Sequence, residues 1–266
     1  MEQLLDHLVD TGRAVAGAVA DHLRREAGRT DLRVEVKRTS TDLVTDVDRA
    51  GEALVVEMLR RSRPDDGIIG EEGTAIPGTS GVEWIVDPLD GTTNFVYGHP
   101  GYSVSVAAAL DGELVVGVVA DPVSGQVFVG RAGGGATCNG DPIRCSAEDD
   151  LAQALVATGF GYHPAERARQ ARVLTEVIPH VRDIRRMGGA AIDLCSVALG
   201  RVDAYYERGL NPWDLAAGTV IAREAGAIVT DLDGGPPSAG GCIAAPPALH
   251  GPLVALLQQA ENGEDT

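Results

Sequence analysis

The chain has 266 residues, of which 44% are hydrophobic and only 4% aromatic, and its formal net charge is −17. This length allows one large core or two tightly joined subdomains, and no apolar run approaches the roughly 20 residues that span a bilayer. Because the charge is negative and no Lys/Arg cluster is present, we expect neither membrane association nor direct nucleic-acid binding. A phosphorylated substrate is not excluded, since bound divalent cations reverse the local sign of a site.

Two amphipathic helices are predicted in the first quarter of the chain. Apolar residues recur with helical spacing over 2–27 and again over 44–62. Gly28 and Pro64 are expected to end these helices. Both helices are expected to pack on a sheet.

The middle of the chain changes to a strand pattern. Segments rich in Val and Ala occur at 82–86, 103–110, 113–120 and 126–130. Asp111-Gly112, between two of these segments, is typical of a two-residue hairpin turn. The sequence therefore predicts an antiparallel or mixed sheet here, not a regular βαβ series.

Beyond residue 150, strands and helices alternate. Strands are predicted at 155–158, 181–185, 202–206 and 227–231, and helices at 164–178, 190–199 and 213–225. The polar tail 261–266 is expected to fray. Because no internal repeat or long linker is present, we expect one domain over 1–266, with a division into two tightly packed subdomains near residue 150 as the alternative.

The stretch WIVDPLDGTTNF at 84–95 is the most informative part of the chain. Asp87 and Asp90 stand on either side of Pro88, directly after an apolar run that indicates a strand. Carboxylates, hydroxyls and carbonyls are the ligands that Mg²⁺ and Ca²⁺ prefer. Exposed N–H groups after the Gly91 turn, at a predicted helix start, favour a phosphate. The stretch therefore indicates metal-assisted phosphate chemistry.

A simple turn is the alternative interpretation, because Asp-Pro and Asp-Gly are common turn dipeptides. Two further acidic segments count against it. Glu71-Glu72 follow a short apolar segment between glycines, and Asp214 begins a helical pattern far downstream. One acid of this kind is a cap, whereas three acidic strand or helix ends predict a metal site. Chemistry alone does not choose between Glu71 and Glu72.

The cysteines and the N-terminus indicate in which cell compartment the protein is expected. Cys138, Cys145, Cys195 and Cys242 form no CxxC pair, and no histidine stands at zinc-ligand spacing near them. We expect buried free thiols, which fit a reducing cytosol. The N-terminus lacks a basic segment followed by an apolar one, so we expect no signal peptide and a cytoplasmic protein.

The chain resembles the inositol monophosphatase family of Mg²⁺-dependent, lithium-sensitive phosphatases. Six segments carry the resemblance; each is a weak signal, but they run in the family's order. They are KRTSTDLVTDVD at 37–48, GEEG at 70–73, WIVDPLDGTTNF at 84–95, GGGATCNGDPI at 133–143, RRMGGAA at 185–191 and DAYYERGLNPWDLAAG at 203–218. The resemblance implies an α/β fold, a layered αβαβα sandwich with mixed, largely antiparallel sheets. It also implies a homodimer.

The resemblance implies roles for individual residues. Two or three Mg²⁺ ions would be held by Glu71, Asp87, the Leu89 carbonyl, Asp90 and Asp214. The implied catalytic residues are Glu71, Thr92 and Asp46, the last two forming a relay to the attacking water. Implied substrate contacts are Asp90, Gly91, Thr92, Gly188, Gly189, Ala190, Glu207 and Asp214.

Several of these residues have simpler interpretations. Thr92 and Asp46 are also ordinary residues for a helix start, and Glu207 is a surface acid in the simplest interpretation. Lys37 aligns with a basic residue near the family's site, although a lone Lys on a strand is usually solvated. Many relatives carry Ser or Thr at Gly189, so a hydroxyl contact to substrate is missing here.

We therefore expect a Mg²⁺-dependent phosphomonoesterase that hydrolyses a small polyol phosphate. Thr93-Asn94-Phe95 favours inositol 1-phosphate as the substrate. Fructose 1,6-bisphosphate, histidinol phosphate and 3′-phosphoadenosine 5′-phosphate are the alternatives within the family. A regulatory binding protein that keeps the phosphatase fold is the alternative of another class. A structural Ca²⁺ module is disfavoured, because the acids are not spaced as an EF-hand loop.

Overall fold

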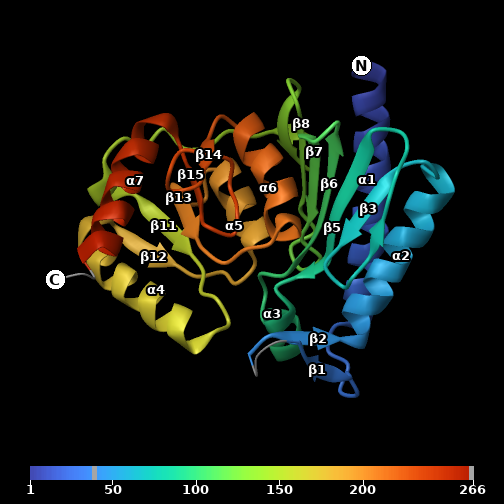
Figure 1. Ribbon diagram of the computed structural model, residues 1–266, viewed down its shortest axis with the longest axis horizontal. Helices are drawn as coiled ribbons and strands as arrows, with labels where there is room; N and C mark the ends of the chain where they lie inside the picture. Colours follow the sequence, from blue (N-terminus) through green and yellow to red (C-terminus); the bar gives the residue numbers. More distant parts are fainter. Residues whose placement is uncertain (38–40, 264–266) are drawn as a thin grey trace.

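The computed structural model describes residues 1–37 and 41–263. The two larger sheets alternate with three layers of helices (Figure 1). Helices α1 and α2 cover one face of the larger sheet, α5 and α6 lie between the sheets, and α4 and α7 cover the far face of the smaller sheet. The predicted fold class, a layered αβαβα sandwich with mixed sheets, is confirmed.

The first layer contains the two helices predicted from apolar spacing. Helix α1 spans Glu2–Glu26 and α2 spans Asp46–Ser62. Helix α2 begins two residues later than expected, because residues 43–45 form a strand. That strand, β2 (Leu43–Thr45), pairs with β1 (Val34–Val36) in a hairpin that the sequence did not indicate.

The larger sheet has eight strands in the order β10-β9-β8-β7-β6-β5-β3-β4, and only the β3–β5 pair is parallel. Its strands are β3 (Gly67–Gly70), β4 (Ala75–Ile76), β5 (Val82–Asp90), β6 (Ser103–Leu110), β7 (Glu113–Ala120), β8 (Val127–Arg131), β9 (Gly135–Cys138) and β10 (Asp141–Pro142). The predicted antiparallel or mixed sheet is therefore confirmed. Trp84 and Val106 are fully buried against the first helix layer, and Phe128 against α5 and α6.

The smaller sheet has five strands in the order β12-β11-β13-β15-β14, and β11 pairs in parallel with both of its neighbours. Its strands are β11 (Leu155–Thr158), β12 (Asp183–Arg185), β13 (Ala204–Glu207), β14 (Ile228–Thr230) and β15 (Cys242–Ala245). The helices of this half are α4 (Pro164–Val177), α5 (Ala190–Ala198), α6 (Pro212–Glu224) and α7 (Pro247–Asn262). The division into subdomains near residue 150 stays a prediction.

Strand β15 and helix α7 were absent from the sequence prediction. Helix α7 buries Leu249, Leu253 and Leu257 along one stripe. The expected fraying is wrong for Glu261, whose carboxylate accepts two hydrogen bonds from Arg208. Residues 264–266 of the predicted tail lie outside the described residues.

Free, buried thiols were predicted at the four cysteines. All four are free; three are buried and Cys145 is half-buried. Among the described residues, no helix is both long and apolar enough to cross a membrane.

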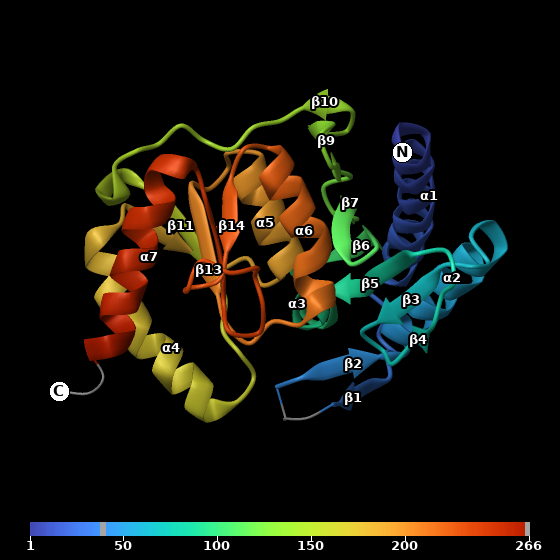
Figure 2. The ribbon, with the colours of Figure 1, turned by 45° about the horizontal axis from the view of Figure 1, so that its top comes forward.

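The layering brings several chain ends together. The C-terminal end of β5, helix α3 (Thr92–Tyr97) and the N-terminal end of α6 meet between the two halves of the molecule (Figure 2). The predicted site segments lie at this junction.

Candidate active site

Strand β5 ends in a turn that brings its two aspartates together. The β5–β6 register shifts between Asp87 and Asp90, and Asp87 Oδ1 accepts a hydrogen bond from the Leu89 N–H at 2.9 Å. Gly91 follows with φ of +89°, and a Cβ there would lie 2.8 Å from the Gly101 carbonyl oxygen. Only glycine fits both this conformation and this close approach, so Asp-Gly fixes the corner at which α3 begins.

A cavity of about 370 Å³ lies at this corner. It collects most of the residues that the sequence predicted for the site: Glu71, Asp87, Leu89, Asp90, Gly91, Thr92, Gly188, Ala190, Glu207 and Asp214. Gly189 lies directly beside it, since a Cβ on Gly189 would stand 2.8 Å from Asp90 Oδ2. Asp46 is not part of the cavity wall.

Backbone groups hold acids of the cavity, and two of these acids are buried. Asp87 is 1% exposed and Asp90 is 7% exposed. Asp90 Oδ2 accepts a hydrogen bond of 2.9 Å from the Ala191 N–H at the start of α5. Asp214 Oδ2 accepts one of 2.6 Å from the Asn211 N–H, which completes a capping box at the start of α6. The helix-cap role of Asp214 and its place in the cavity therefore coexist.

Burial and mutual repulsion perturb these acids strongly. Burial, reinforced by the charges of Glu71, Asp90 and Asp214, raises the pKa of Asp87 well above its ordinary value. Burial is also the main cause that raises the pKa of Asp90 and the pKa of Asp214 to about 7. Carboxylates that raise one another's pKa in this way create a strong local demand for positive charge.

The donor set suits Mg²⁺. It consists of carboxylates together with the Leu89 carbonyl, all hard oxygen ligands. Among the described residues, no three Asp, Glu, His or Cys side chains already close round one point as a cage. Mg²⁺ does not require such a cage, because it keeps several waters and binds through one or two carboxylates plus substrate phosphate oxygens. The buried, mutually repelling acids therefore fit this ion.

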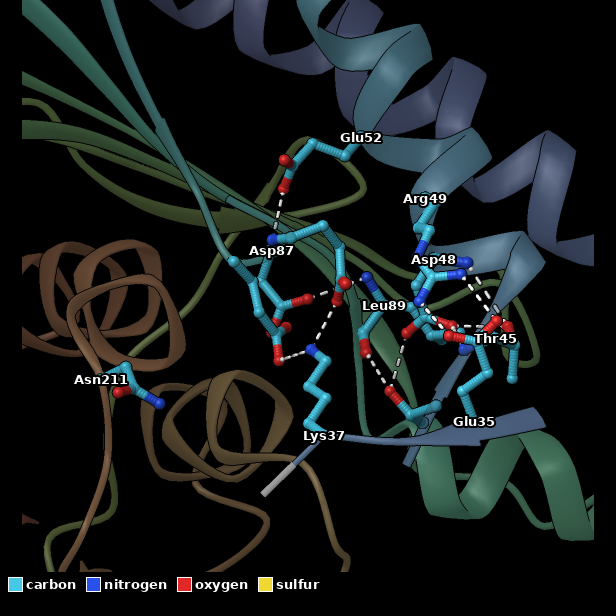
Figure 3. A network of polar contacts seen from close by, with 12 residues as sticks. Glu35, Lys37, Thr45, Asp48, Arg49, Glu52, Asp87, Leu89 and Asn211 are labelled. Atoms are coloured by element: carbon cyan, nitrogen blue, oxygen red, sulfur yellow. Dashed lines mark hydrogen bonds and ion pairs between the residues drawn. The ribbon is translucent and has the colours of Figure 1, made fainter. Parts of the chain in front are cut away.

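Lys37 is the only lysine in the sequence, and its ammonium group lies at the acids. Its Nζ donates hydrogen bonds of 2.8 Å to Glu71 Oε1 and 2.5 Å to Glu72 Oε1 (Figure 3). The interpretation of Lys37 as a solvated strand residue is therefore wrong. Glu72 is not solvated either, since its side chain is 7% exposed. Burial raises the pKa of Glu72 to about 7, although Lys37 opposes this rise.

The acid at the Thr92 hydroxyl is Asp48, not Asp46. Thr92 Oγ1 lies 2.9 Å from Asp48 Oδ1 and 3.2 Å from the Leu89 carbonyl oxygen. Asp46 instead accepts hydrogen bonds from the Arg33 N–H and from Arg29. Residues two apart on a helix point to different sides, so α2 turns Asp46 away while Asp48 faces α3. The capping box of Thr45 and Asp48 was the signal that could have identified the right acid.

Glu52 is a supporting residue that the sequence did not reveal. It lies on α2, is 5% exposed, and accepts hydrogen bonds from the Glu72 N–H at 2.7 Å and the Thr74 N–H at 3.0 Å. A Cβ on Gly70 would lie 2.3 Å from Glu52 Oε2. Glu52 therefore anchors the turn that presents Glu71, and Gly70 leaves room for it. A lone Glu within an amphipathic helix gives no sequence signal for this role.

Glu207 also lines the cavity. Its Oε2 accepts a hydrogen bond of 2.7 Å from the Tyr205 hydroxyl. Burial raises the pKa of Glu207 to about 7, while Tyr205 and the charge of Arg186 oppose the rise. The surface-acid interpretation of Glu207 is therefore wrong. Arg186 lines the same cavity and was not predicted from the sequence.

Comparison with known proteins identifies the family. The model of the inositol monophosphatase family matches residues 1–262. The chain belongs to this family. An inositol-1-monophosphatase of Mycobacterium leprae is 47% identical over 253 residues, covering 89% of this chain and 87% of that protein. A crystal structure of the extragenic suppressor protein suhB from Bartonella henselae superposes with a TM-score of 0.91 at 35% identity, covering 95% of this chain and 99% of that one.

Membership of the inositol monophosphatase family implies phosphatase activity, and the family is Mg²⁺-dependent in general. Not all relatives carry an enzyme name. A protein of Pasteurella multocida that is 39% identical, with 99% of both chains covered, is named Nus factor SuhB.

Proposed function

We propose that this chain is a Mg²⁺-dependent phosphomonoesterase that hydrolyses a small polyol phosphate, with inositol 1-phosphate as its main substrate. The carrying observation is the group of acids Asp87, Asp90 and Asp214 around one cavity, whose pKa values are raised by burial and by the charges of neighbouring carboxylates. A site of this kind binds a phosphate monoester only when cations offset both sets of negative charge. The family's general Mg²⁺ dependence supports the same choice of cation.

Glu71, Asp87, the Leu89 carbonyl, Asp90 and Asp214 would hold two or three Mg²⁺ ions. When bound, Mg²⁺ supplies positive charge that offsets the phosphate and lowers the pKa of water. Asp87 is the least exposed of these acids, at 1%, and would be one of the ligands of the ions. Lys37 leaves Glu71 partly neutralised at the edge of the cavity.

The chain's own groups then orient water and substrate. The Thr92 hydroxyl donates a hydrogen bond to Asp48, so its oxygen is free to accept one from the attacking water. Glu71 lines the same cavity and is the second proposed acceptor. The N–H groups of Gly91 and Thr92 are the proposed phosphate donors. No nucleophilic side chain is needed, because the phosphoryl group passes directly to water. The P–O bond to the alcohol breaks, and a proton from the water ends on the leaving oxygen.

The part of the cavity around Glu207 is proposed to bind the leaving alcohol. Asp90, Asp214 and Glu207 offer carboxylate oxygens to its hydroxyls, and the backbone of 188–190 lies beside them. Because Gly189 has no side chain, this contact uses backbone atoms only. A polyol offers several hydroxyl donors to such a wall, whereas an aryl leaving group offers none.

A phosphate-release assay tests the function. Inositol 1-phosphate, fructose 1,6-bisphosphate, histidinol phosphate and 3′-phosphoadenosine 5′-phosphate are compared with Mg²⁺ and after chelation. We expect Mg²⁺-dependent release with the highest kcat/KM for inositol 1-phosphate. A higher kcat/KM for another ester would make that ester the main substrate instead. No release from any ester would refute the proposed function.

A regulatory binding role is the second candidate, and the Pasteurella relative named a Nus factor favours it. Asp87→Asn separates the two, because a binding role survives loss of the metal acid and turnover does not.

We also propose that the protein is a cytoplasmic homodimer. Tyr97 is 72% exposed and Val123 is 53% exposed, and such apolar side chains are suited to an interface between subunits. Light scattering during size-exclusion chromatography measures the assembly.

A further inference from the structure

The Glu207 carboxylate is held by one buried hydroxyl, that of Tyr205. Tyr205 and Glu207 are two positions apart on β13, so their side chains leave the same face of the strand. The Tyr205 side chain is fully buried, in a cluster with Leu194 and Val197 of α5. This packing fixes the ring, and its Oη donates a hydrogen bond of 2.7 Å to Glu207 Oε2.

The neighbouring strand leaves the space that the carboxylate occupies. Gly159 directly follows β11, whose Thr158 pairs with Tyr206 of β13. A Cβ on Gly159 would lie only 1.9 Å from Glu207 Oε2 and 2.1 Å from its carboxyl carbon. The φ angle of Gly159 lies outside the left-handed region, so glycine is required here for space and not for backbone conformation.

Tyr205 is a permanent donor. Burial raises the pKa of its hydroxyl well above the ordinary value, so the hydroxyl stays protonated across the neutral range. Within the described residues, it is the only group that donates a hydrogen bond to the Glu207 carboxylate. Because this bond uses Oε2, Oε1 remains an acceptor on a residue that lines the cavity.

We propose that Tyr205 is a positioning residue that sets the preference of the site for polyol phosphates, by holding Glu207 so that its second oxygen accepts a hydrogen bond from a hydroxyl of the leaving alcohol. Gly159 provides the room for this arrangement. The inference rests on the proposed function, and it assigns the choice of substrate to a hydroxyl that does not itself touch the substrate.

The adjacent tyrosine is a matched control. Tyr206 leaves the opposite face of β13 and packs against the core between the smaller sheet and helices α4 and α7. Tyr205→Phe and Tyr206→Phe each remove one buried hydroxyl from neighbouring positions on the same strand. Only the first change frees the Glu207 carboxylate.

The experiment compares kcat/KM for inositol 1-phosphate and p-nitrophenyl phosphate. Tyr205→Phe is expected to lower the value for inositol 1-phosphate about tenfold and leave the aryl ester within about twofold, as for loss of a hydrogen bond to a charged group. Tyr206→Phe should change neither. Adding Tyr205→Phe to Glu207→Gln should cause no further loss, because both changes remove the same contact. Gly159→Ala should also lower kcat/KM for inositol 1-phosphate selectively. This second variant tests the proposal if Tyr205→Phe does not fold.

Equal losses on both esters, or losses at 205 and 207 that multiply, would overturn the positioning role. A preference for inositol 1-phosphate that persists in both Tyr205→Phe and Gly159→Ala would also overturn the positioning role of Tyr205. It would leave the proposed function intact. A wild-type protein that cleaves the aryl ester but does not prefer the polyol ester would instead refute the proposed substrate.

Discussion

The Thr92 hydroxyl at the start of α3 donates a hydrogen bond to Asp48 Oδ1 on α2 over 2.9 Å, although the two residues are 44 positions apart. The other carboxylate oxygen of Asp48 accepts from the N–H and hydroxyl of Thr45. Asp48 is therefore held on both sides. With its proton directed at Asp48, the Thr92 oxygen is oriented to accept a hydrogen bond from water at the cavity.

We predict that Thr92 and Asp48 act as one unit in orienting the attacking water. Thr92→Val and Asp48→Asn should each lower kcat about a hundredfold, the range typical of losing a positioned acid–base group. The double variant should be little worse than either single variant, because effects within a catalytic unit are not additive. Steady-state phosphate release measures all three.

Asp46→Asn is the control for this cycle. It removes a neighbouring carboxylate from the same helical turn, but one that contacts Arg29 and Arg33 outside the cavity. Its kcat should stay within about threefold of wild type, since surface ion pairs contribute little. A larger loss at Asp46 than at Asp48 would contradict the assignment.

Lys37 is predicted to stabilise the metal-free protein. Its ammonium group touches Glu71 and Glu72, and removing a partly buried counter-charge leaves both acids unpaired. Lys37→Gln should lower the free energy of unfolding by about 1–3 kcal/mol in the presence of a chelator. Urea unfolding measures this difference.

Arg49→Gln provides the comparison for Lys37. Arg49 forms an ion pair with Glu35, and both side chains are more than half exposed, so its loss should cost little stability. If Lys37→Gln destabilised the protein no more than Arg49→Gln, Lys37 would have no special role at the acids.

The site acids should make the metal-free protein less stable as pH rises. Burial raises the pKa of Asp90 and of Asp214 to about 7 in the folded state, whereas an unfolded Asp titrates near about 3.9. Between these values the native state binds more protons than the unfolded state, so the free energy of unfolding falls with rising pH. Mg²⁺ favours the ionised acids and should reverse this loss.

Thermal unfolding tests the pH dependence directly. Mg²⁺ should raise Tm more at about pH 8 than at about pH 5, because the acids are protonated at the lower pH. The Asp214→Asn variant should show a smaller difference between the two pH values. A Mg²⁺-induced shift in Tm that is equal at both pH values would contradict the proposed role of these acids.

Regular periodicity made much of the fold predictable. Strands β6 and β7 have the residue bounds that were predicted from their Val/Ala runs and the Asp111-Gly112 turn. Helix α7 was missed because prolines normally indicate loops: Pro246 and Pro247 stand at its start and Pro252 lies inside it. The stripe of Leu249, Leu253 and Leu257 was the signal that could have found it.

The site was less predictable, since its geometry depends on contacts between distant elements. The Asp-Pro-Leu-Asp-Gly motif located the acids because a local turn places them. Asp48 was missed because the choice between it and Asp46 depends on where α2 begins. Glu52 and Gly159 were missed because each acts through a partner from another part of the chain.

The buried acids at the end of β5 are proposed to hold Mg²⁺ for phosphate hydrolysis. The direct test is a Mg²⁺ titration of phosphate release from inositol 1-phosphate by wild type, Asp87→Asn and Asp121→Asn. Asp121 is a buried acid outside the cavity that accepts hydrogen bonds from Val123 and Ser124, so its variant controls for loss of a buried charge. We predict no release by wild type in chelator, full recovery with Mg²⁺, and at least about a hundredfold lower kcat for Asp87→Asn at every Mg²⁺ concentration. Release by wild type that persists in chelator, or an Asp87→Asn variant as active as Asp121→Asn, would contradict a Mg²⁺ site at these acids.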